Sequence, residues 1–341
     1  MSPTTRWMTR APILMLLSLA SMGRTAAQTT GTDRLGGMLA WFSRPYILHV
    51  PPGYDGRVRL PLVIVFHGGG GNKEAARLQT CPNQDLADPG CLDRLADAEG
   101  FFVVYPDGTF GSPLARNFRV FNAGGGILGY ACIEDVACEQ GVDDVGYVSD
   151  LIDDVERSVR VDPARIYATG LSNGGALCYR LACQLSGRIA AIAPIAAGNQ
   201  FAAVESCAPV RSVPVLDIHG TADPCWPYDG GSTTCTGLPS PGLRVSVVAS
   251  VLGWAIRNGC RAGVTMRDWP DADPSDGTTV TQHTFGDCRD GGDVVHLRVN
   301  GGGHTWPGGS DPLPDWIVGT SSREFSANRV MWEFFKAHPM R

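Results

Sequence analysis

The chain carries no surplus of positive charge and almost no lysine. Of its 341 residues, 28 are Lys or Arg and 34 are Asp or Glu, which gives a formal net charge of −6 at pH 7. Lysine occurs at two positions only, Lys73 and Lys336. Proteins that bind nucleic acid neutralise its phosphates with an excess of basic residues. We therefore expect no nucleic-acid partner.

Charged residues, repeats and linkers are also scarce. Charged residues make up 18% of the chain, against 43 glycines and 24 prolines, which excludes a coiled coil and a charged disordered tail. No internal repeat and no Ser/Thr/Pro-rich linker divides the sequence. Its 43% of hydrophobic residues suffice for a sizeable core. We expect one large domain over residues 28–341.

Long hydrophobic runs are absent beyond the first 27 residues. Arg6 and Arg10 precede a short apolar run over residues 11–20, and small residues fill positions 25–27. This order is typical of a secretory signal peptide, and the run is too short to cross a bilayer core of about 30 Å as a helix. The alternative is an uncleaved N-terminal anchor. We expect residues 1–27 to be removed, and the mature protein to be secreted, extracellular or periplasmic, without a stable membrane anchor.

Cysteine spacing of the metal-binding type is absent as well. The 11 cysteines include no C-x-x-C pair and the histidines do not cluster, so we expect no metal and no other cofactor. An exported chain pairs most of its cysteines, and an odd count leaves at least one unpaired. Spacing favours three short disulfides but leaves the connectivity open. These candidate pairs are Cys81 with Cys91, Cys132 with Cys138, and Cys225 with Cys235.

Strand and helix patterns alternate along the chain. Short β-branched and aromatic runs predict strands, and a helical apolar period over residues 143–161, ended by Asp162-Pro163, predicts an amphipathic helix. The expected strands cover residues 46–50, 62–66, 101–105, 165–169, 189–196, 213–218 and 294–299, and further helices cover residues 173 to about 185 and 324–338. This alternation favours an α/β fold with a mainly parallel sheet and helices on both faces.

One glycine-rich turn carries a candidate nucleophile. In Gly170-Leu171-Ser172-Asn173-Gly174 the serine lies between an expected strand and an expected helix. The G-x-S-x-G string is weak by itself, but a nucleophile elbow requires this strand–turn–helix setting. N–H groups at the start of the helix can stabilise an oxyanion. We expect Ser172 to be the nucleophile and the Asn173 N–H to be one oxyanion donor; the alternative is a plain glycine-rich turn.

A serine nucleophile needs a base, and the base needs an orienting carboxylate. His304 ends a glycine run directly after a strand, on a loop of the kind that often carries catalytic groups. His296 lies within a strand pattern, His338 lies in the tail, and His283 has no motif around it. We expect His304 to be the base, against the alternative of an ordinary loop histidine.

The acid follows a strand that contains a second aspartate. Asp217 falls inside the expected strand, whereas Asp223 lies just past its end, at the edge where parallel sheets open their sites. We therefore expect Asp223 to be the acid. The order Ser172, Asp223, His304 is that of α/β-hydrolases. The glycine run after His67 offers a second oxyanion donor, for which Gly69 is our choice and Gly68 the next.

Four motifs together resemble a known family. They are His67-Gly-Gly, Gly170-Leu-Ser-Asn-Gly, His219-Gly-Thr-Ala-Asp-Pro and Gly302-Gly-His-Thr-Trp-Pro. They look like the secreted esterases that join polyhydroxybutyrate depolymerases with feruloyl and acetylxylan esterases, and the last two motifs are the more specific. The resemblance runs from about Arg44 to the C-terminus. It implies an α/β-hydrolase fold with the triad already named. The four glycines after His67 depart from the family, which often has a larger residue after His-Gly.

The resemblance also bears on the remaining cysteines and on the substrate. It implies that Cys183 pairs with Cys207 and Cys260 with Cys288, which leaves Cys178 as the free thiol. It implies a serine carboxylic-ester hydrolase that acts through an acyl-enzyme on feruloyl or other plant-polysaccharide esters, or on polyhydroxybutyrate-type polyesters and oligomers. The alternatives are a secreted acyltransferase of the mycolyltransferase type and a non-catalytic polymer-binding protein.

Two tryptophans lie beside the proposed acid and base in the sequence. Trp226 follows Asp223 by three residues, and Trp306 follows His304 by two. Aromatic side chains at such places either wall a substrate pocket or pack in the core. We name both as candidate pocket residues.

Overall fold

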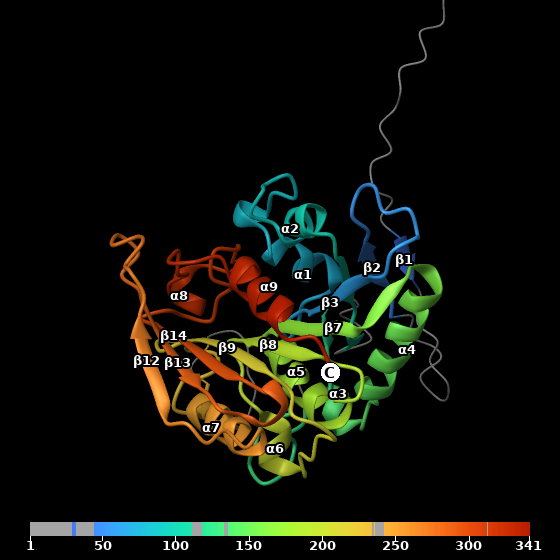
Figure 1. Cartoon of the computed structure of the whole chain (residues 1–341). Coiled ribbons are helices and arrows are strands. Elements are labelled where there is room, and N and C mark those ends of the chain that lie inside the picture. The colour runs from blue at the N-terminus through green and yellow to red at the C-terminus, as the bar shows by residue number, and fades with distance from the viewer. Residues whose placement is uncertain are drawn as a thin grey trace, which may run out of the picture.

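A ten-stranded sheet forms the centre of the molecule (Figure 1). The structure is a computed structural model, and it describes residues 29–31, 44–110, 118–132, 136–233, 235, 242–311 and 313–341. The expected signal peptide lies outside the described residues. In spatial order the strands are β1 (Thr29–Gly31), β2 (Tyr46–His49), β4 (Phe102–Pro106), β3 (Leu60–Phe66), β7 (Val161–Leu171), β8 (Ala191–Ile195), β9 (Val215–Gly220), β14 (Val294–Asn300), β13 (Thr279–Phe285) and β12 (Val264–Asp268).

The middle of this sheet is parallel and its two edges are antiparallel. Each neighbouring pair from β4 to β14 is parallel. The pairs β1–β2 and β2–β4 at one edge, and β14–β13 and β13–β12 at the other, are antiparallel. The expected mainly parallel sheet is confirmed. Because the central strands are parallel, their carboxyl ends share one edge, where α/β proteins place their sites.

Helices cover both faces of the sheet, as Figure 1 shows. On one face α1 (Lys73–Gln79), α2 (Leu92–Glu99) and α9 (Ala327–Ala337) pack into one buried apolar cluster. On the other face α4 (Asp144–Ser158), α5 (Asn173–Gln184) and α7 (Val247–Arg257) pack into a second. Short elements complete the described fold: α3 (Val136–Glu139), α6 (Gln200–Val204), α8 (Asp315–Val318), 3-10 turns at Pro82–Gln84 and Arg289–Gly291, and the ribbons β5 (Thr109–Phe110) with β6 (Arg119–Val120) and β10 (Gly231–Ser232) with β11 (Leu243–Arg244). In the described part of the chain, no helix combines the length and the apolar character needed to cross a membrane.

Two parts of the sheet differ from the sequence prediction. Strand β7 begins at Val161 rather than at Arg165, and its pairing with β3 shifts register after Leu60. The shift accommodates Pro163, which has no N–H to donate to a ladder. The hairpin β12–β13 was not predicted. All five residues of β12 are exposed, and the alternation of apolar and polar residues in Val264–Asp268 covers only four positions.

The structure contains five disulfides. They pair Cys81 with Cys91, Cys132 with Cys138, Cys183 with Cys207, Cys225 with Cys235, and Cys260 with Cys288. The three pairs expected from spacing and the two implied by the resemblance are all present. Cys178 is the free cysteine and is buried in α5, where burial raises the pKa of its thiol. It is therefore an unreactive packing residue.

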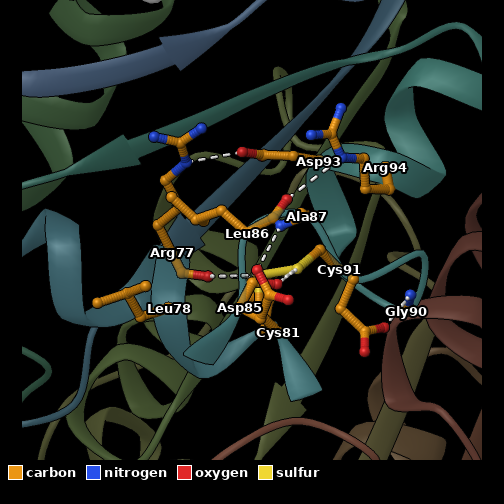
Figure 2. Close-up of a disulfide and its surroundings, with 12 residues drawn as sticks. Arg77, Leu78, Cys81, Asp85, Leu86, Ala87, Gly90, Cys91, Asp93 and Arg94 are labelled. Carbon is orange, nitrogen blue, oxygen red and sulfur yellow. Dashed lines mark hydrogen bonds and ion pairs between the residues drawn. A yellow bond between two sulfur atoms is a disulfide. The ribbon is translucent and has the colours of Figure 1, made fainter. Parts of the chain in front are cut away.

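One disulfide joins α1 to α2 beside a buried ion pair (Figure 2). Cys81 follows α1 and Cys91 is the residue before α2. Arg77 of α1 donates from Nε to the Asp93 carboxylate of α2 at 2.7 Å, and both side chains are buried. The two contacts fix α1 against α2, and α1 supplies part of the cavity described below.

A second buried ion pair provides a test of the fold. Asp144 at the start of α4 accepts hydrogen bonds from the Arg44 guanidinium and from the Asn122 N–H, and it is fully buried. Asp144→Ala leaves a buried cation without its partner, so we expect a loss of about 3–5 kcal/mol of unfolding free energy in urea titrations. In the control Asp55→Ala, which breaks the exposed pair with Arg57, stability should hardly change. Equal effects in the two variants would contradict the prediction.

Candidate active site

The proposed nucleophile sits on a strained turn. Ser172 lies between β7 and α5 with φ 56° and ψ −117°, outside the conformations that residues with a side chain prefer. Its N–H donates to the Ile195 carbonyl of β8 at 2.9 Å, which fixes the turn against the neighbouring strand. This is the expected elbow, and it presents Ser172 at the carboxyl edge of the sheet.

Two glycines allow the elbow to form. A Cβ at Gly170 would lie 2.7 Å from the Phe66 carbonyl oxygen, and a Cβ at Gly174 would lie 2.5 Å from that same oxygen. Both clashes are with backbone, which cannot move aside as a side chain can. Any larger residue at either position would push β3 away from β7 and α5. The G-x-S-x-G pattern is therefore a packing requirement of this turn.

The proposed base and acid are directly bonded. His304 Nδ1 lies 2.8 Å from Asp223 Oδ2, and both side chains are buried. The other carboxylate oxygen of Asp223 accepts the N–H groups of Cys225 and Trp226 at 2.8 and 2.7 Å. Burial alone would raise the pKa of Asp223, but the charge of His304 and hydrogen bonds from His219 and His304 outweigh it and lower the pKa to about 2. Asp223 is therefore a carboxylate at neutral pH.

The same bond fixes which nitrogen of His304 can act as a base. Because a carboxylate only accepts, Nδ1 carries the proton and Nε2 is left for the serine. Ser172 and His304 line one cavity. Among the described residues the structure has no hydrogen bond between these two side chains, a contact that often forms only once substrate is bound.

The first proposed oxyanion donor is held by two hydrogen bonds to Phe121. Asn173 is the first residue of α5, so no helical carbonyl can accept its N–H. Its buried side chain accepts the Phe121 N–H at 2.7 Å and donates to the Phe121 carbonyl at 2.9 Å. These bonds hold the start of the helix in place.

The glycine loop narrows the choice of the second donor. The N–H groups of Gly70 and Gly71 donate to Arg119 and Gly68 carbonyls at 2.9 and 3.0 Å, which leaves Gly68 and Gly69 as candidates. The Gly68 carbonyl also accepts from His67 Nδ1 at 2.7 Å. Because a trans peptide is planar, the Gly69 N–H points opposite to that fixed carbonyl. Gly69 remains our proposed donor.

His67 orients this loop and takes no part in proton transfer. Its Nε2 accepts the Gly108 N–H at 2.9 Å, so the proton lies on Nδ1. Burial, together with nearby Arg119, Arg44 and Lys73, lowers the pKa of His67 to about 3 despite the bond to Gly68. The ring is therefore uncharged at neutral pH, and its two hydrogen bonds hold the loop in position.

The cavity beside Ser172 has a volume of about 360 Å³. Its walls include the glycine loop, Ala75, Ala76 and Gln79 from α1, and the disulfide of Cys225 and Cys235. The lining residues that the sequence did not predict include Phe118, Arg244, Asp311 and Leu313. They come from segments far apart in the sequence, so no local pattern could have identified them. Burial raises the pKa of Asp311.

The two tryptophans proposed for the pocket belong to the core, which corrects that expectation. Trp226 and Trp306 are each 1% exposed, and neither is among the residues that line the cavity. Their indole N–H groups donate to the Val245 carbonyl and to Asn328 Oδ1, both at 3.0 Å. Each buried ring therefore holds its own loop against the core.

A second buried aspartate–histidine pair lies within the sheet. His296 Nδ1 is 2.7 Å from Asp217 Oδ1, and its Nε2 is 2.8 Å from the Tyr228 hydroxyl. Tyr179 of α5 donates to the other Asp217 oxygen at 2.9 Å. Every polar atom of this pair is thus occupied by protein, in agreement with the structural role expected for His296.

The sheet and the strand–turn–helix at Ser172 define the class of protein, an α/β-hydrolase. The chain belongs to the esterase PHB depolymerase family, whose sequence profile matches residues 44–253. A protein described as "Putative esterase NocK" from Nocardia uniformis subsp. tsuyamanensis is 31% identical over 320 residues, which cover 91% of this chain and 84% of the relative. The family resemblance expected from the motifs is confirmed.

Further relatives agree on the reaction. Feruloyl esterase B of Piromyces equi is 28% identical over 267 residues, which cover 76% of this chain but 42% of that larger protein. An acetyl xylan esterase from Aspergillus awamori superposes with a TM-score of 0.52 at 14% identity, over 86% of this chain and 94% of its own, and shows the shared fold. The protein is a carboxylic ester hydrolase.

The disulfide in the cavity wall should matter for catalysis as well as for stability. A carboxylate oxygen of Asp223, the Sγ of Cys225 and a ring nitrogen of His304 lie within 4.8 Å of one another. Both sulfurs of the Cys225–Cys235 bridge contact the Ile317 carbonyl of α8. We expect Cys225→Ser with Cys235→Ser to lower kcat/KM at least tenfold, because the bridge would no longer hold the loop that carries Asp223 against α8. The loss of stability should be about 2–3 kcal/mol for this loop with a sequence separation of 10.

A remote disulfide provides the control. Cys183 and Cys207 are 24 residues apart, so Cys183→Ser with Cys207→Ser should cost more stability, about 3–4 kcal/mol, with kcat/KM per folded molecule unchanged. Urea unfolding and active-site titration measure the two quantities. If activity fell only in proportion to stability in both variants, the special role of the Cys225–Cys235 bridge would be wrong.

The lowered pKa of His67 predicts how the unfolding free energy depends on pH. Its pKa is about 3 in the folded protein and near 6.5 when unfolded, so below pH 6.5 the unfolded chain binds a proton that the folded chain does not. The stabilisation is complete above pH 6.5 and declines as pH falls toward 3. In urea titrations from pH 7 to 4, His67→Gln should flatten this decline. An unchanged slope would show that other groups cause it.

Proposed function

We propose that this protein is a serine esterase that cleaves small acyl esters through an acyl-enzyme. The observation that carries the proposal is the convergence of Ser172, at its strained elbow, and the bonded His304–Asp223 pair on one cavity. The bond leaves His304 Nε2 as the proton acceptor. This arrangement supports nucleophilic attack by a serine at neutral pH.

The proposed reaction has two halves. Ser172 Oγ attacks the ester carbonyl while His304 Nε2 takes the hydroxyl proton, and the oxyanion is held by the N–H groups of Asn173 and Gly69. Collapse of this intermediate breaks the ester C–O bond, and the proton on His304 passes to the departing alcohol. Water then attacks the acyl-enzyme in the same way and releases the acid. Asp223 holds the imidazole and stabilises its charged form in both halves.

The cavity supports a small acyl group as the part of the substrate that enters. Its volume of about 360 Å³ is at the lower end of ligand pockets, and most of its lining residues are apolar or glycine. We propose short acyl or hydroxycinnamoyl esters of plant polysaccharides as the substrates, in line with the names of the feruloyl and acetylxylan esterase relatives. The polymer would then remain outside the cavity.

We also propose that the mature chain, residues 28–341, is a single exported catalytic domain. One ten-stranded sheet, with β1 at one edge and β12 at the other, spans the described part of the chain, and five disulfides suit an oxidising compartment. The N-terminal sequence pattern supports cleavage after residue 27.

A substrate panel tests the proposed specificity. Methyl ferulate, acetylated xylan, hydroxybutyrate oligomers and p-nitrophenyl esters should be compared by kcat/KM, with and without added sugar acceptors. We expect the feruloyl or acetyl esters to exceed the hydroxybutyrate oligomers, and sugars to leave the products unchanged. A preference for hydroxybutyrate oligomers would identify a polyester hydrolase, and acyl transfer to sugar would identify a transferase.

Ser172→Ala tests the mechanism. We expect kcat to fall by about 10⁶-fold with the melting temperature nearly unchanged, because the nucleophile is lost from an otherwise intact site. A fluorophosphonate probe should label the wild type at Ser172, as located by peptide mass spectrometry. Labelling at another serine, or full activity in the variant, would contradict the assignment and leave a non-catalytic role for this turn.

A further inference from the structure

A second histidine contacts the proposed catalytic acid. His219 lies at the end of β9, with its side chain fully buried, and its Nε2 is 3.2 Å from Asp223 Oδ2. The same nitrogen is 2.9 Å from the Trp226 carbonyl oxygen. Asp223 Oδ2 is also the oxygen that holds His304. One carboxylate oxygen is therefore shared by two imidazoles.

These contacts define where His219 carries its proton. A carbonyl and a carboxylate both accept, so Nε2 must be the donor to each of them. Nδ1 is buried and has no hydrogen-bond partner among the described residues. The ring thus makes all its polar contacts through one atom, and each of them is to the segment that begins at Asp223.

We propose that His219 is a positioning residue for ester hydrolysis, which holds the Asp223 carboxylate and the Trp226 backbone in the geometry that His304 requires. The inference rests on the proposed function, in which Asp223 orients the base. The proposed roles of the turn at Ser172 and of the glycine loop after His67 do not depend on His219.

The geometry explains why one donor to both groups is useful. Asp223 Oδ1 accepts the N–H groups of Cys225 and Trp226, which curl the chain back over the carboxylate. His219 closes this turn from the other side, because its Nε2 bonds both the Trp226 carbonyl and the second carboxylate oxygen, Oδ2. Burial lowers the pKa of His219, but hydrogen bonding to Asp223 and the charges of Asp223 and Asp217 raise it overall, because the two nearby carboxylates favour the charged ring.

The length of the side chain at position 219 provides the test. Glutamine places an amide N–H near the position of His Nε2, whereas asparagine is one methylene shorter and leucine has no donor. We expect His219→Leu and His219→Asn to lower kcat by about 10- to 100-fold with KM little changed, the size of effect typical of residues that orient an active-site ligand. His219→Gln should recover to within about fivefold of wild type. The rate of fluorophosphonate labelling at Ser172 should follow kcat, because it needs the same base but no ester substrate.

A buried histidine on a different strand supplies the matched control. His49 of β2 is buried and lies 2.8 Å from Asp97, so His49→Gln also removes a histidine–aspartate contact. It should leave kcat and labelling of the folded protein unchanged, even if the melting temperature shifts. If His219→Leu fails to fold, the comparison of Gln with Asn still decides. Equal rates for Gln and Asn, or rates within about threefold of wild type in all variants, would overturn the inference alone. An unlabelled wild type would overturn the proposed nucleophile, and the inference with it.

Discussion

The turn at Ser172 is the constraint on which the rest of the site depends. A non-glycine residue with φ 56° and ψ −117° costs of order 1–3 kcal/mol and persists only where its surroundings leave no alternative. Here β3 and β8 flank β7, the Ile195 carbonyl holds the Ser172 N–H, and glycines at 170 and 174 let backbone approach backbone. The parallel sheet is thus the frame that maintains one strained residue, and the proposed acid, base and oxyanion donors are placed relative to it.

The two buried aspartate–histidine pairs show why position in the fold, more than bond length, decides which pair can act. The distances are 2.7 Å for His296–Asp217 and 2.8 Å for His304–Asp223. Asp217 lies within β9, where Tyr179 of α5 covers it, and the second nitrogen of His296 is taken by Tyr228. Asp223 lies beyond the strand, and the second nitrogen of His304 remains available to the cavity. A side chain inside a strand is covered by the helices that pack on the sheet, whereas a side chain past its end is not.

The same distinction explains how much the sequence could predict. The expected sheet, the elbow, and the contact of Asp223 with His304 were accessible because each follows from a local pattern and from strand ends that must share one edge. The cavity lining was not accessible, because Phe118, Arg244 and Asp311 meet only through the tertiary fold. Trp226 was misplaced for a related reason: proximity to Asp223 in sequence says nothing about which side of the loop faces the core. The structure turns the ring inward, where its N–H finds the Val245 carbonyl.

A disulfide adds stability at the place where apolar packing is weakest. The loop that carries Asp223 packs on α8 through a small cluster of apolar residues, Cys225, Cys235, Val318 and Ile317. This cluster buries far less apolar surface than the core on either face of the sheet. Such a cluster would open more readily than the core, since local stability follows local burial. The bridge from Cys225 to Cys235 compensates at the point where the proposed acid, the proposed base and the cavity wall meet, while the bridge from Cys81 to Cys91 joins α1, which also lines the cavity, to α2. In the proposed exported enzyme, an oxidising compartment therefore sets the shape of the active site as well as the stability of the fold.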